Sequence, residues 1–348
     1  MKLILAGTWL GKGGFFEGIL KSMHFLSSIQ DIKKFTPPFF LLVPYTLSTQ
    51  TLELEIKNEG EKIILAELVG FKPYNPKKSS GVELKLKGAI LSDEEYKERI
   101  KKIKKYIEKG DVYQINLTNR FEFELKGSSE ELFFNFYEAQ PVPFAFYLEL
   151  EDFYVISGSM ELFLEKKGNV IRSKPIKGTA KEEKTLLLSE KERAENLMIT
   201  DMMRNDIGRI ARTGSVEVEE LFKVEKYRTL YHMHSTVKGI TDKSLSEILS
   251  STFPPASVTG APKRRAVEII DELEPFSRSY YCGSGGLVFS EEDFTLSVLI
   301  RTAIGRGDRL YYYAGCGIVW DSVEERETEE MHLKVEAFKR AGSLVFQR

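Results

Sequence analysis

Cysteine, histidine and net charge are all scarce in this chain. Its 348 residues include 2 cysteines and 4 histidines, and 50 basic against 52 acidic side chains leave a formal net charge of −2. Cys282 and Cys316 are too few for a disulfide framework, so we expect two reduced, buried thiols in a cytoplasmic protein. The balanced charge gives no electrostatic case for binding nucleic acid or an anionic membrane surface.

Long apolar runs and familiar nucleotide-binding motifs are also missing. No apolar run approaches the roughly 18 residues that a membrane helix needs, and glycine and lysine interrupt the segment 1–20 too early for a signal peptide. The glycines match neither a Walker A loop nor a Rossmann fingerprint. With 42% hydrophobic and 29% charged residues, the composition is that of a globular protein with a large core.

The most informative stretch of the sequence is 175–209. It places Lys177 on a tight Gly-Thr turn and then opens a long helix, for which Ser189 is the N-cap and Glu192 completes a capping box. Apolar residues at helical spacing predict which face of this helix is buried. The predicted stripe consists of Leu197, Met198, Met202 and Ile207.

Two predicted helices each present a pair of glutamates one turn apart. Glu192 and Glu195 share a face of the helix just described, and Glu327 and Glu330 share a face of the closing helix at 322–342. The residue types alone leave two interpretations open. Either the carboxylates hold a hard cation through oxygen ligands, or they complement the dipoles of the two helix N-termini.

The rest of the chain predicts further helices and antiparallel strands. Ser92 caps a helix that ends before Gly110, and Leu52 begins an apolar alternation over 52–56 that indicates a strand. The run 294–305 is expected to form one strand, and the loop 72–81 is expected to join an N-terminal β-rich segment to the main body. The buried stripe predicted for the first helix is Tyr96, Ile100, Ile103 and Ile107.

Several polar side chains interrupt apolar runs and are candidates for chemistry. Glu161 has apolar neighbours, which raise a carboxyl pKa and suit a general acid, although an outward-facing position is the alternative. His232 and His234 point to one face of a strand, but without a third ligand nearby we discount zinc. Arg301 needs a carboxylate partner, either structural or from a ligand. Gln114 fits an edge position and a pocket position equally.

A series of motifs, taken in order, resembles the chorismate-utilising enzymes over roughly residues 90–340. They are GDVYQINL, SGSMELFL, PIKGT, AENLMITDMMRNDIGR, FPPASVTGAPKRRAVEII, YYCGSGG, IRTAI, AGCGIVWDS and ERETEEMHLKV. The resemblance implies an α+β fold, with two antiparallel sheets packed face to face and helices on the outside. It implies one chorismate-binding domain over 1–348, in which a β-rich segment 1–85 is joined to a catalytic core 86–342.

The same resemblance implies a cofactor and a set of binding residues. Mg²⁺ would be held by Glu195 and Glu330, with Glu192 and Glu327 assisting directly or through water. Its role would be to bind the ring carboxylate of chorismate and help the C4 hydroxyl leave. The implied substrate contacts are Gln114, Gly178, Thr179, Thr259, Tyr281, Arg301, Gly317 and Lys334.

Two positions discriminate between branches of the family. Members that add water carry a lysine base where this chain has Gln114, whose amide cannot deprotonate water. The PIKGT loop resembles aminodeoxychorismate synthase component I, in which a lysine at the position of Lys177 attacks C2 before ammonia attacks C4 and expels it. Glu161 is implied to protonate the departing hydroxyl, and His232 to lie beside the reacting ring. The implied product is 4-amino-4-deoxychorismate, on the route to 4-aminobenzoate and folate.

Two alternative functions and one partner follow from the same comparison. Anthranilate synthase component I has a similar loop that reads PIAGT, and a non-catalytic chorismate-binding subunit is the alternative from another class. No cysteine stands in a glutaminase nucleophile motif, so a separate glutamine amidotransferase subunit is expected to supply ammonia. Met160 replaces the proline usual in the family. The N-terminal segment shows no tryptophan-binding motif, so feedback by tryptophan is not expected.

Overall fold

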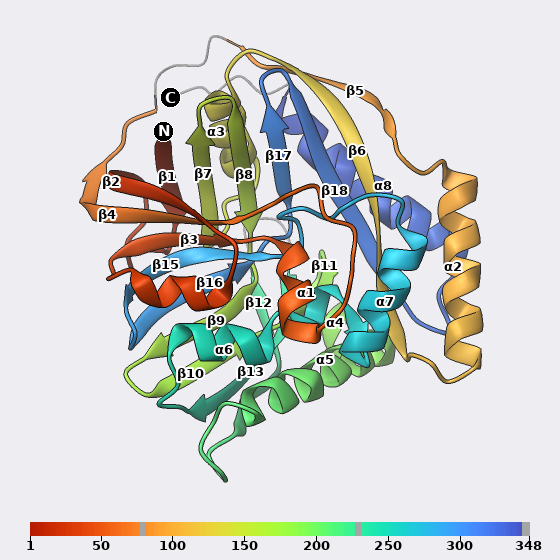
Figure 1. Cartoon of the computed structure of the whole chain (residues 1–348). Helices are drawn as coiled ribbons and strands as arrows, with labels where there is room; N and C mark the ends of the chain where they lie inside the picture. Colours follow the sequence, from red (N-terminus) through yellow and green to blue (C-terminus); the bar gives the residue numbers. More distant parts are fainter. Residues whose placement is uncertain (77–80, 227–230, 343–348) are drawn as a thin grey trace.

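The computed structural model describes residues 1–76, 81–226 and 231–342 (Figure 1). It is an α+β structure in which every strand pairing among the described residues is antiparallel. The predicted loop at 72–81 lies partly outside the described residues. Both cysteines are free and buried, as predicted.

The helices and strands are distributed along the whole of the described chain. The strands are β1 (Lys2–Gly7), β2 (Phe15–Leu26), β3 (Phe39–Val43), β4 (Ile63–Pro73), β5 (Glu83–Ala89), β6 (Gln114–Lys126), β7 (Phe144–Leu150), β8 (Phe153–Ser159), β9 (Leu162–Lys167), β10 (Val170–Lys174), β11 (Ile176–Ala180), β12 (Glu217–Lys226), β13 (Tyr231–Ile240), β14 (Gly260–Ala261), β15 (Ser284–Ser290), β16 (Asp293–Val298), β17 (Thr302–Arg306) and β18 (Arg309–Ile318). The α-helices are α1 (Ser48–Leu52), α2 (Asp93–Glu108), α3 (Ser129–Ala139), α4 (Glu183–Leu188), α5 (Glu190–Gly208), α6 (Leu245–Thr252), α7 (Lys263–Leu273) and α8 (Glu324–Ala341). None of the described helices is long and apolar enough to span a membrane.

The strands pair in one continuous order that folds back on itself. From β5 the order runs through β6, β18, β17, β8, β7 and β1 to β2. It continues through β4, β3, β15, β16, β9 and β10 to β13, which carries both β11 and β12. In Figure 1 the strands of the first half run across those of the second. The two halves are the two sheets, and β1 and β2 join them.

Alternating side chains on β1 show what covers each face of the first sheet. Leu3 and Leu5 belong to the apolar cluster between the sheets, whereas Ile4 belongs to a second cluster beneath the helices. Phe40 of β3 and Phe146 of β7 come from opposite sheets and pack edge to face, with ring centroids 4.9 Å apart. The predicted face-to-face packing is therefore confirmed.

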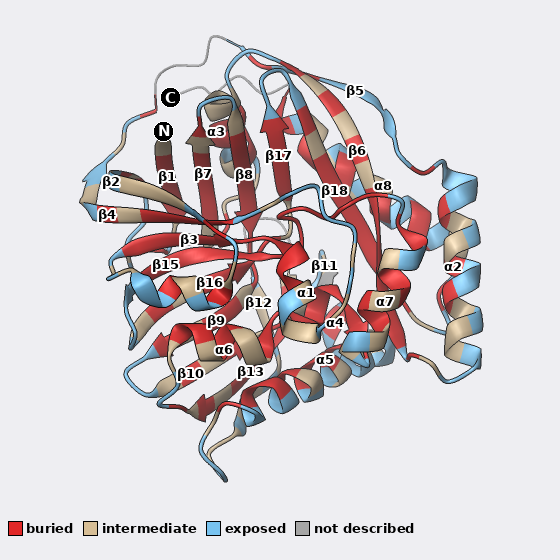
Figure 2. Cartoon of the chain, viewed as in Figure 1, coloured by how far each residue is buried: buried red, intermediate tan, exposed pale blue. Residues whose placement is uncertain are grey.

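Helices α2, α3 and α8 cover the outer face of the first sheet. Phe338 of α8 stacks on Tyr312 of β18 with ring centroids 4.2 Å apart, and Phe136 of α3 contacts the same phenylalanine ring. Figure 2 shows burial concentrated in the strands and on the inner sides of the helices, with exposed residues along the outside of α2. The helices lie outside the sheets, as predicted.

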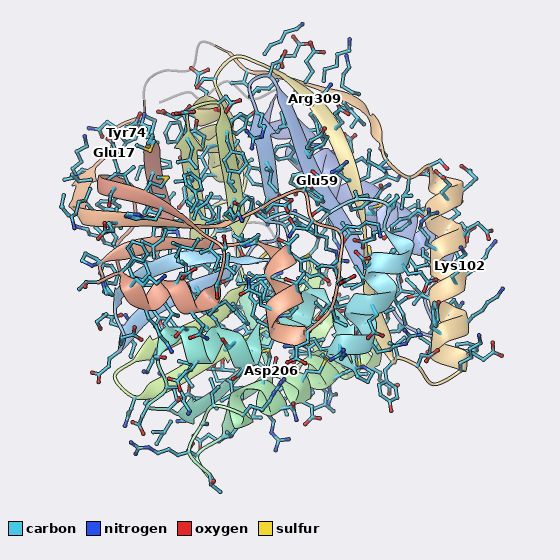
Figure 3. The ribbon with its side chains drawn as sticks, in the orientation of Figure 1. Glu17, Glu59, Tyr74, Lys102, Asp206 and Arg309 are labelled. Atoms are coloured by element: carbon cyan, nitrogen blue, oxygen red, sulfur yellow. The ribbon has the colours of Figure 1, made fainter. Side chains whose placement is uncertain are left out.

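Helix α2 follows its sequence signals. Ser92 is its N-cap and forms a full capping box with Glu95. Its buried residues are Tyr96, Ile100 and Ile103, while Ile107 is partly buried. Lys102 points away from the protein on the opposite face (Figure 3). The predicted apolar stripe is confirmed, except that its last member lies at the margin.

Helix α5 begins as predicted but buries a different face. Ser189 is its N-cap and accepts a hydrogen bond from the backbone N–H of Glu192. The predicted stripe is confirmed at Ile207, and Met202 packs partly buried against the core, but Met198 is only partly buried and Leu197 is 52% exposed. The buried residues are Asn196, Ile199, Thr200, Met203, Asp206 and Ile207. Because Glu192 and Glu195 lie one turn before members of this face, the acidic pair turns toward the interior.

The strand predicted at 52–56 is wrong. Helix α1 ends at Leu52, and Glu53 follows with a left-handed φ of 53°. The expected alternation reflects a loop that packs only some of its apolar side chains, because Leu54 and Ile56 are partly buried against the core without pairing to another strand.

The single strand predicted at 294–305 is also wrong, because the chain passes from one sheet to the other within this segment. Strand β16 ends at Val298 and β17 begins at Thr302, with Arg301 between them at a φ of 51°. Strand β16 pairs with β9 of the second sheet, whereas β17 pairs with β8 of the first. The chain therefore crosses from one sheet to the other at Arg301.

Candidate active site

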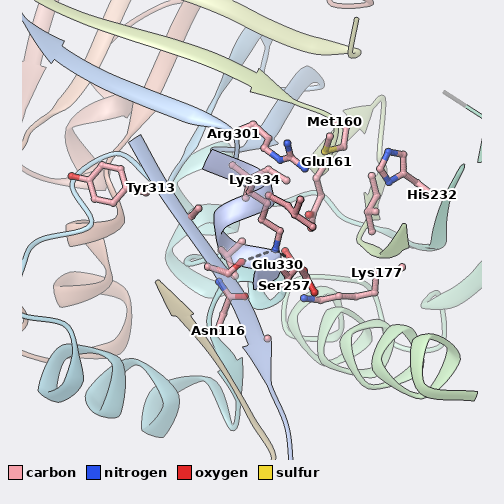
Figure 4. Close-up of a pocket in the computed structure, with 18 of the residues that line it drawn as sticks. Asn116, Met160, Glu161, Lys177, His232, Ser257, Arg301, Tyr313, Glu330 and Lys334 are labelled. Atoms are coloured by element: carbon pink, nitrogen blue, oxygen red, sulfur yellow. Dashed lines mark hydrogen bonds and ion pairs between the residues drawn. The ribbon is translucent and has the colours of Figure 1, made fainter. Parts of the chain in front are cut away.

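A cavity of about 540 Å³ opens where the two sheets meet the first turns of α5 and α8 (Figure 4). Its walls come from β11, β13, β18, the two helices and the crossing at Arg301. Most residues that the sequence predicts for the site line this cavity. They are Glu161, Lys177, Gly178, Glu192, Glu195, His232, Tyr281, Arg301, Gly317, Glu327, Glu330 and Lys334.

The remaining predicted substrate contacts do not line the cavity or cannot be placed. Gln114 is buried directly behind Gly317, where a Cβ on the glycine would come within 2.4 Å of Gln114 Nε2. Thr259 is also buried, and its hydroxyl donates to two backbone carbonyls of the preceding turn. It therefore shapes the turn that leads into α7. The side chain of Thr179 lies outside the described part of the structure.

Lys177 reaches into the cavity from β11. The next residue, Gly178, has a φ of +94°, and a Cβ there would lie 3.0 Å from Glu192 Oε2. Glycine thus lets the strand approach α5 closely in a conformation that other residues rarely adopt. Figure 4 shows the Lys177 side chain directed toward Glu330 and Lys334. Its charge acts on Glu161 as well as on the acidic pair of α5.

Burial and mutual repulsion govern the carboxylates of α5. Burial raises the pKa of Glu192, and the charges of Glu330 and Glu327 add to the rise, while Lys191 and Lys177 oppose it. Burial likewise raises the pKa of Glu195, with Glu192 adding to the effect. Neighbouring carboxylates repel one another when ionised, so a cation would stabilise their charged forms.

The pair on α8 has a closer lysine. Lys334 Nζ lies 2.8 Å from Glu330 Oε1 and donates to the carbonyl of Gly315 at 2.7 Å. Burial raises the pKa of Glu330, but the charge and hydrogen bond of Lys334 outweigh it, and the net pKa is lowered. Ligand atoms of Cys316, Glu327 and Glu330 lie within 4.8 Å of one another. This group contains the α8 pair and a thiol but neither glutamate of α5, and its carboxylate oxygens are the donors that suit a hard divalent cation.

Glu161 is buried and lies immediately before β9. Burial raises its pKa to about 7, against the opposing effects of a hydrogen bond from Ser257 and the charge of Lys177. A carboxyl group with this pKa is partly protonated at neutral pH and can donate a proton to a leaving group. The sequence-based expectation of a raised pKa agrees with this environment.

The two histidines of β13 are both buried, and their pKa values are both lowered. Burial and the nearby charge of Arg301 lower the pKa of His232 to about 4. Burial and the charge of Lys174 lower the pKa of His234 to about 4, although Glu225 lies 3.3 Å from its Nε2. His232 therefore faces the cavity as a neutral imidazole at neutral pH.

Arg301 lines the cavity without a carboxylate partner among the described residues. The left-handed backbone at this residue stands at the crossing between the sheets, and such strain is found mainly at functional sites. Tyr281, stacked on Tyr313 with ring centroids 5.1 Å apart, lines the same cavity. An arginine of this kind suits an anionic ligand, because its guanidinium binds a carboxylate through two hydrogen bonds.

The structure also brings in residues that the sequence analysis missed. Asn116, two residues after Gln114 in β6, lines the cavity in its place. Ser257 hydrogen-bonds the Glu161 carboxyl, and Lys191 lies between the acidic pairs. A signal existed for Asn116, since alternate residues of a strand share a face. The sequence carries no signal for Ser257 or Lys191, because their contacts include residues distant along the chain.

The family model for chorismate binding enzymes matches residues 31–340. Aminodeoxychorismate synthase component 1 of Bacillus subtilis is 38% identical over 268 residues, covering 74% of this chain and 57% of that protein. Anthranilate synthase component 1 of Aquifex aeolicus is 39% identical over 263 residues, covering 72% and 53%. The chain spans about half the length of the curated relatives it matches.

A solved structure gives the same result for the fold. Anthranilate synthase component I of Streptococcus pneumoniae superposes with a TM-score of 0.77 at 23% identity, covering 98% of this chain and 90% of that one. Relatives with two different names are almost equally similar, so the comparisons identify the family and leave the reaction open. The family model covers most of the described chain and includes every residue that lines the cavity. The chain belongs to the chorismate binding enzymes.

Proposed function

We propose that the protein is an aminodeoxychorismate synthase, component I, which converts chorismate and ammonia to 4-amino-4-deoxychorismate. The observation that carries the proposal is the position of Lys177. Lys177 lines the cavity, where a Cβ on Gly317 would come within 3.7 Å of its Nζ, and its charge acts on the general-acid candidate Glu161 and on the acidic pair of α5. A primary amine held there is placed to act as a nucleophile on a bound ring.

Chorismate carries two carboxylates, and the cavity offers a cation for each. Arg301 would bind the enolpyruvyl carboxylate, and Lys334, which lines the same cavity, pairs with Glu330. Mg²⁺ held by Glu195 and Glu330, with Glu192 and Glu327 assisting, would neutralise the ring carboxylate and promote departure of the C4 hydroxyl. The substrate would thus be fixed at both ends, with its ring beside Lys177.

The proposed reaction takes place in two displacements. The Lys177 amine forms a bond to C2, the ring double bond shifts, and the C4–O bond breaks as Glu161 donates a proton, so that water leaves. Ammonia then attacks C4, the double bond shifts back, and the C2–N bond breaks to release Lys177 as the neutral amine. The ammonium group formed at C4 returns its extra proton to Glu161. The neutral imidazole of His232 would pack beside the ring without exchanging a proton at neutral pH.

Analysis of the reaction products tests this proposal. Purified protein incubated with chorismate, Mg²⁺ and an ammonium salt is expected to form 4-amino-4-deoxychorismate, identified by chromatography. Lys177→Ala should lose most of this product and gain ortho-aminated product, because ammonia then reaches C2 directly. Lys177→Arg keeps the charge without the nucleophile and should also lose the para product. A Lys177→Arg variant that forms it at near wild-type rate would exclude the covalent step.

Anthranilate synthase is the second candidate, and the relative from Aquifex aeolicus favours it. Ortho-aminated product or anthranilate from the wild-type protein would establish it in place of the first. Absence of any product, with chorismate still bound, would instead indicate a binding subunit. The component I name of the relatives also supports a separate subunit that supplies ammonia from glutamine.

A further inference from the structure

Lys191 differs from the other two lysines of the cavity in where it comes from and what it touches. It stands in the first turn of α5 and lines the cavity mouth with its side chain 55% exposed. Its Nζ lies 3.9 Å from Glu195 Oε1 on its own helix and 3.9 Å from Glu327 Oε1 on α8. Both of these carboxylates are far more buried than the lysine, at 15% and 6% exposure.

This contact is the only ion pair between α5 and α8 among the described residues. At 3.9 Å the ammonium group is beyond hydrogen-bond distance from either carboxylate, so charge holds it there without a fixed geometry. The Lys191 charge also opposes the rise in the pKa of Glu192 and contributes to the lowered pKa of Glu330, so it acts on both acidic pairs. Lys191 is therefore positioned as a shared counter-ion.

We propose that Lys191 is a built-in counter-ion that neutralises the acidic cluster when no divalent cation is bound, and that it competes with the metal for Glu195 and Glu327. This inference rests on the metal site of the proposed function. A divalent cation that contacts these oxygens directly would repel the ammonium group and displace it. The flexible stem of an exposed lysine allows it to move into solvent at little cost.

Competition predicts that removing Lys191 strengthens metal binding, whereas removing a metal ligand would weaken it. Loss of Lys191 should strengthen metal binding, because the carboxylates no longer have a competing cation. From the usual strength of an exposed ion pair, Lys191→Gln is expected to bind Mg²⁺ about two- to fivefold more tightly than wild type by calorimetry. Lys191→Arg, which keeps the charge, should stay near the wild-type affinity. Added NaCl should reduce the difference.

Thermal unfolding gives a second readout that needs no activity. In EDTA, Lys191→Gln leaves Glu195 and Glu327 without their shared cation, and its Tm should fall by about 1–2 °C. Saturating Mg²⁺ should then raise the Tm of this variant by more than it raises that of the wild type. Lys339→Gln serves as the matched control, because it removes an exposed lysine from the far end of α8.

The outcomes separate this inference from the metal assignment. Tighter Mg²⁺ binding and a larger metal-induced rise in Tm for Lys191→Gln, absent from Lys339→Gln and Lys191→Arg, would establish the counter-ion. If wild type binds Mg²⁺ and Lys191→Gln binds it equally or more weakly, the inference is overturned while the metal site stands. If neither protein binds Mg²⁺, the inference and the metal site both fail.

Discussion

Glu161 shows how a single residue reports on its surroundings. The sequence placed a carboxylate among apolar neighbours, and this pattern alone favoured a raised pKa. The sequence left an outward-facing position open, and the burial seen in the structure decides the direction of the shift. The opposing influences of Ser257 and Lys177 could not be read from the sequence, because both residues reach Glu161 only after the chain folds.

The raised pKa of Glu161 predicts a pH-dependent effect on stability. Its pKa is about 7 in the folded protein and 4.5 in the exposed reference state. The folded state holds this proton more tightly, so the group's contribution is fully present below pH 4.5 and is lost as pH rises through 7. Glu161→Gln should therefore have a higher Tm than wild type at pH 8, and the gain should shrink toward pH 5. A gain that does not vary with pH would contradict the assignment.

The same variant should lose activity, since an amide cannot donate the proton that the leaving hydroxyl needs. The expected loss is about 100-fold or more. In the wild type, the rate measured at constant free ammonia should fall as pH rises above about 7, where Glu161 loses its proton. Constant free ammonia is the necessary control, because raising the pH of an ammonium solution also raises the concentration of the nucleophile.

At the scale of elements, α5 is held in place by a buried ion pair. Lys263, at the start of α7, lies 2.5 Å from Asp206 and also donates to the carbonyl of Thr252 at 2.8 Å. Figure 3 labels Asp206 on the inner side of α5, facing the rest of the protein. Arg209 contacts the same carboxylate. This pair fixes the helix that presents Glu192 and Glu195 to the cavity.

Removal of one partner should therefore destabilise the protein. Lys263→Met leaves a buried carboxylate with only Arg209 as its counter-ion, and we expect a loss of about 2–3 kcal/mol in the free energy of unfolding, measured by urea denaturation. The double variant with Asp206→Asn should recover part of this loss. Lys243→Met, which breaks an exposed pair with Glu247, is the control and should change stability by less than about 1 kcal/mol. Equal losses in the two lysine variants would contradict the role of the buried pair.

At the scale of the whole molecule, neither cysteine of the chain is suited to act as a nucleophile, because both are buried. Burial raises the pKa of Cys282 to about 12 and that of Cys316 to about 12, so neither thiol forms a thiolate near neutral pH. A glutaminase nucleophile must be reactive and accessible. These are the chain's 2 cysteines. We therefore predict that the purified chain aminates chorismate with ammonium salts and not with glutamine.

Comparison of initial rates with the two nitrogen sources checks this prediction. The double variant Cys282→Ala and Cys316→Ala is the matched control, and its ammonium-dependent activity should survive if it folds, as judged by its thermal transition. Glutamine-dependent product formation by the rigorously purified wild type would contradict the prediction. Restoration of glutamine use by an added amidotransferase subunit would support it.

Local signals in the sequence determined much of this protein. The cap at Ser92 predicted the start of α2. The ordered motifs, through their resemblance to a known family, predicted the α+β fold, the family and most residues of the cavity. The cap depends on neighbours within a few positions, whereas the fold and most of the cavity residues were implied by the resemblance to a known family. The acidic pairs were found from their spacing, because one helical turn brings their members onto one face.

Only the tertiary structure decided which face of α5 is buried, where the chain crosses between the sheets, and which cation serves the acidic cluster. The buried face of α5 is half polar, because Asn196 accepts a hydrogen bond from Ser235 and Asp206 pairs with Lys263, so apolar periodicity found only part of this face. Arg301 breaks a strand because each side of it pairs with a different sheet. Lys191 and Glu327 are 136 positions apart in the sequence, and they meet only when α5 and α8 pack together in the fold. Long-range contacts of this kind leave no local pattern in the sequence.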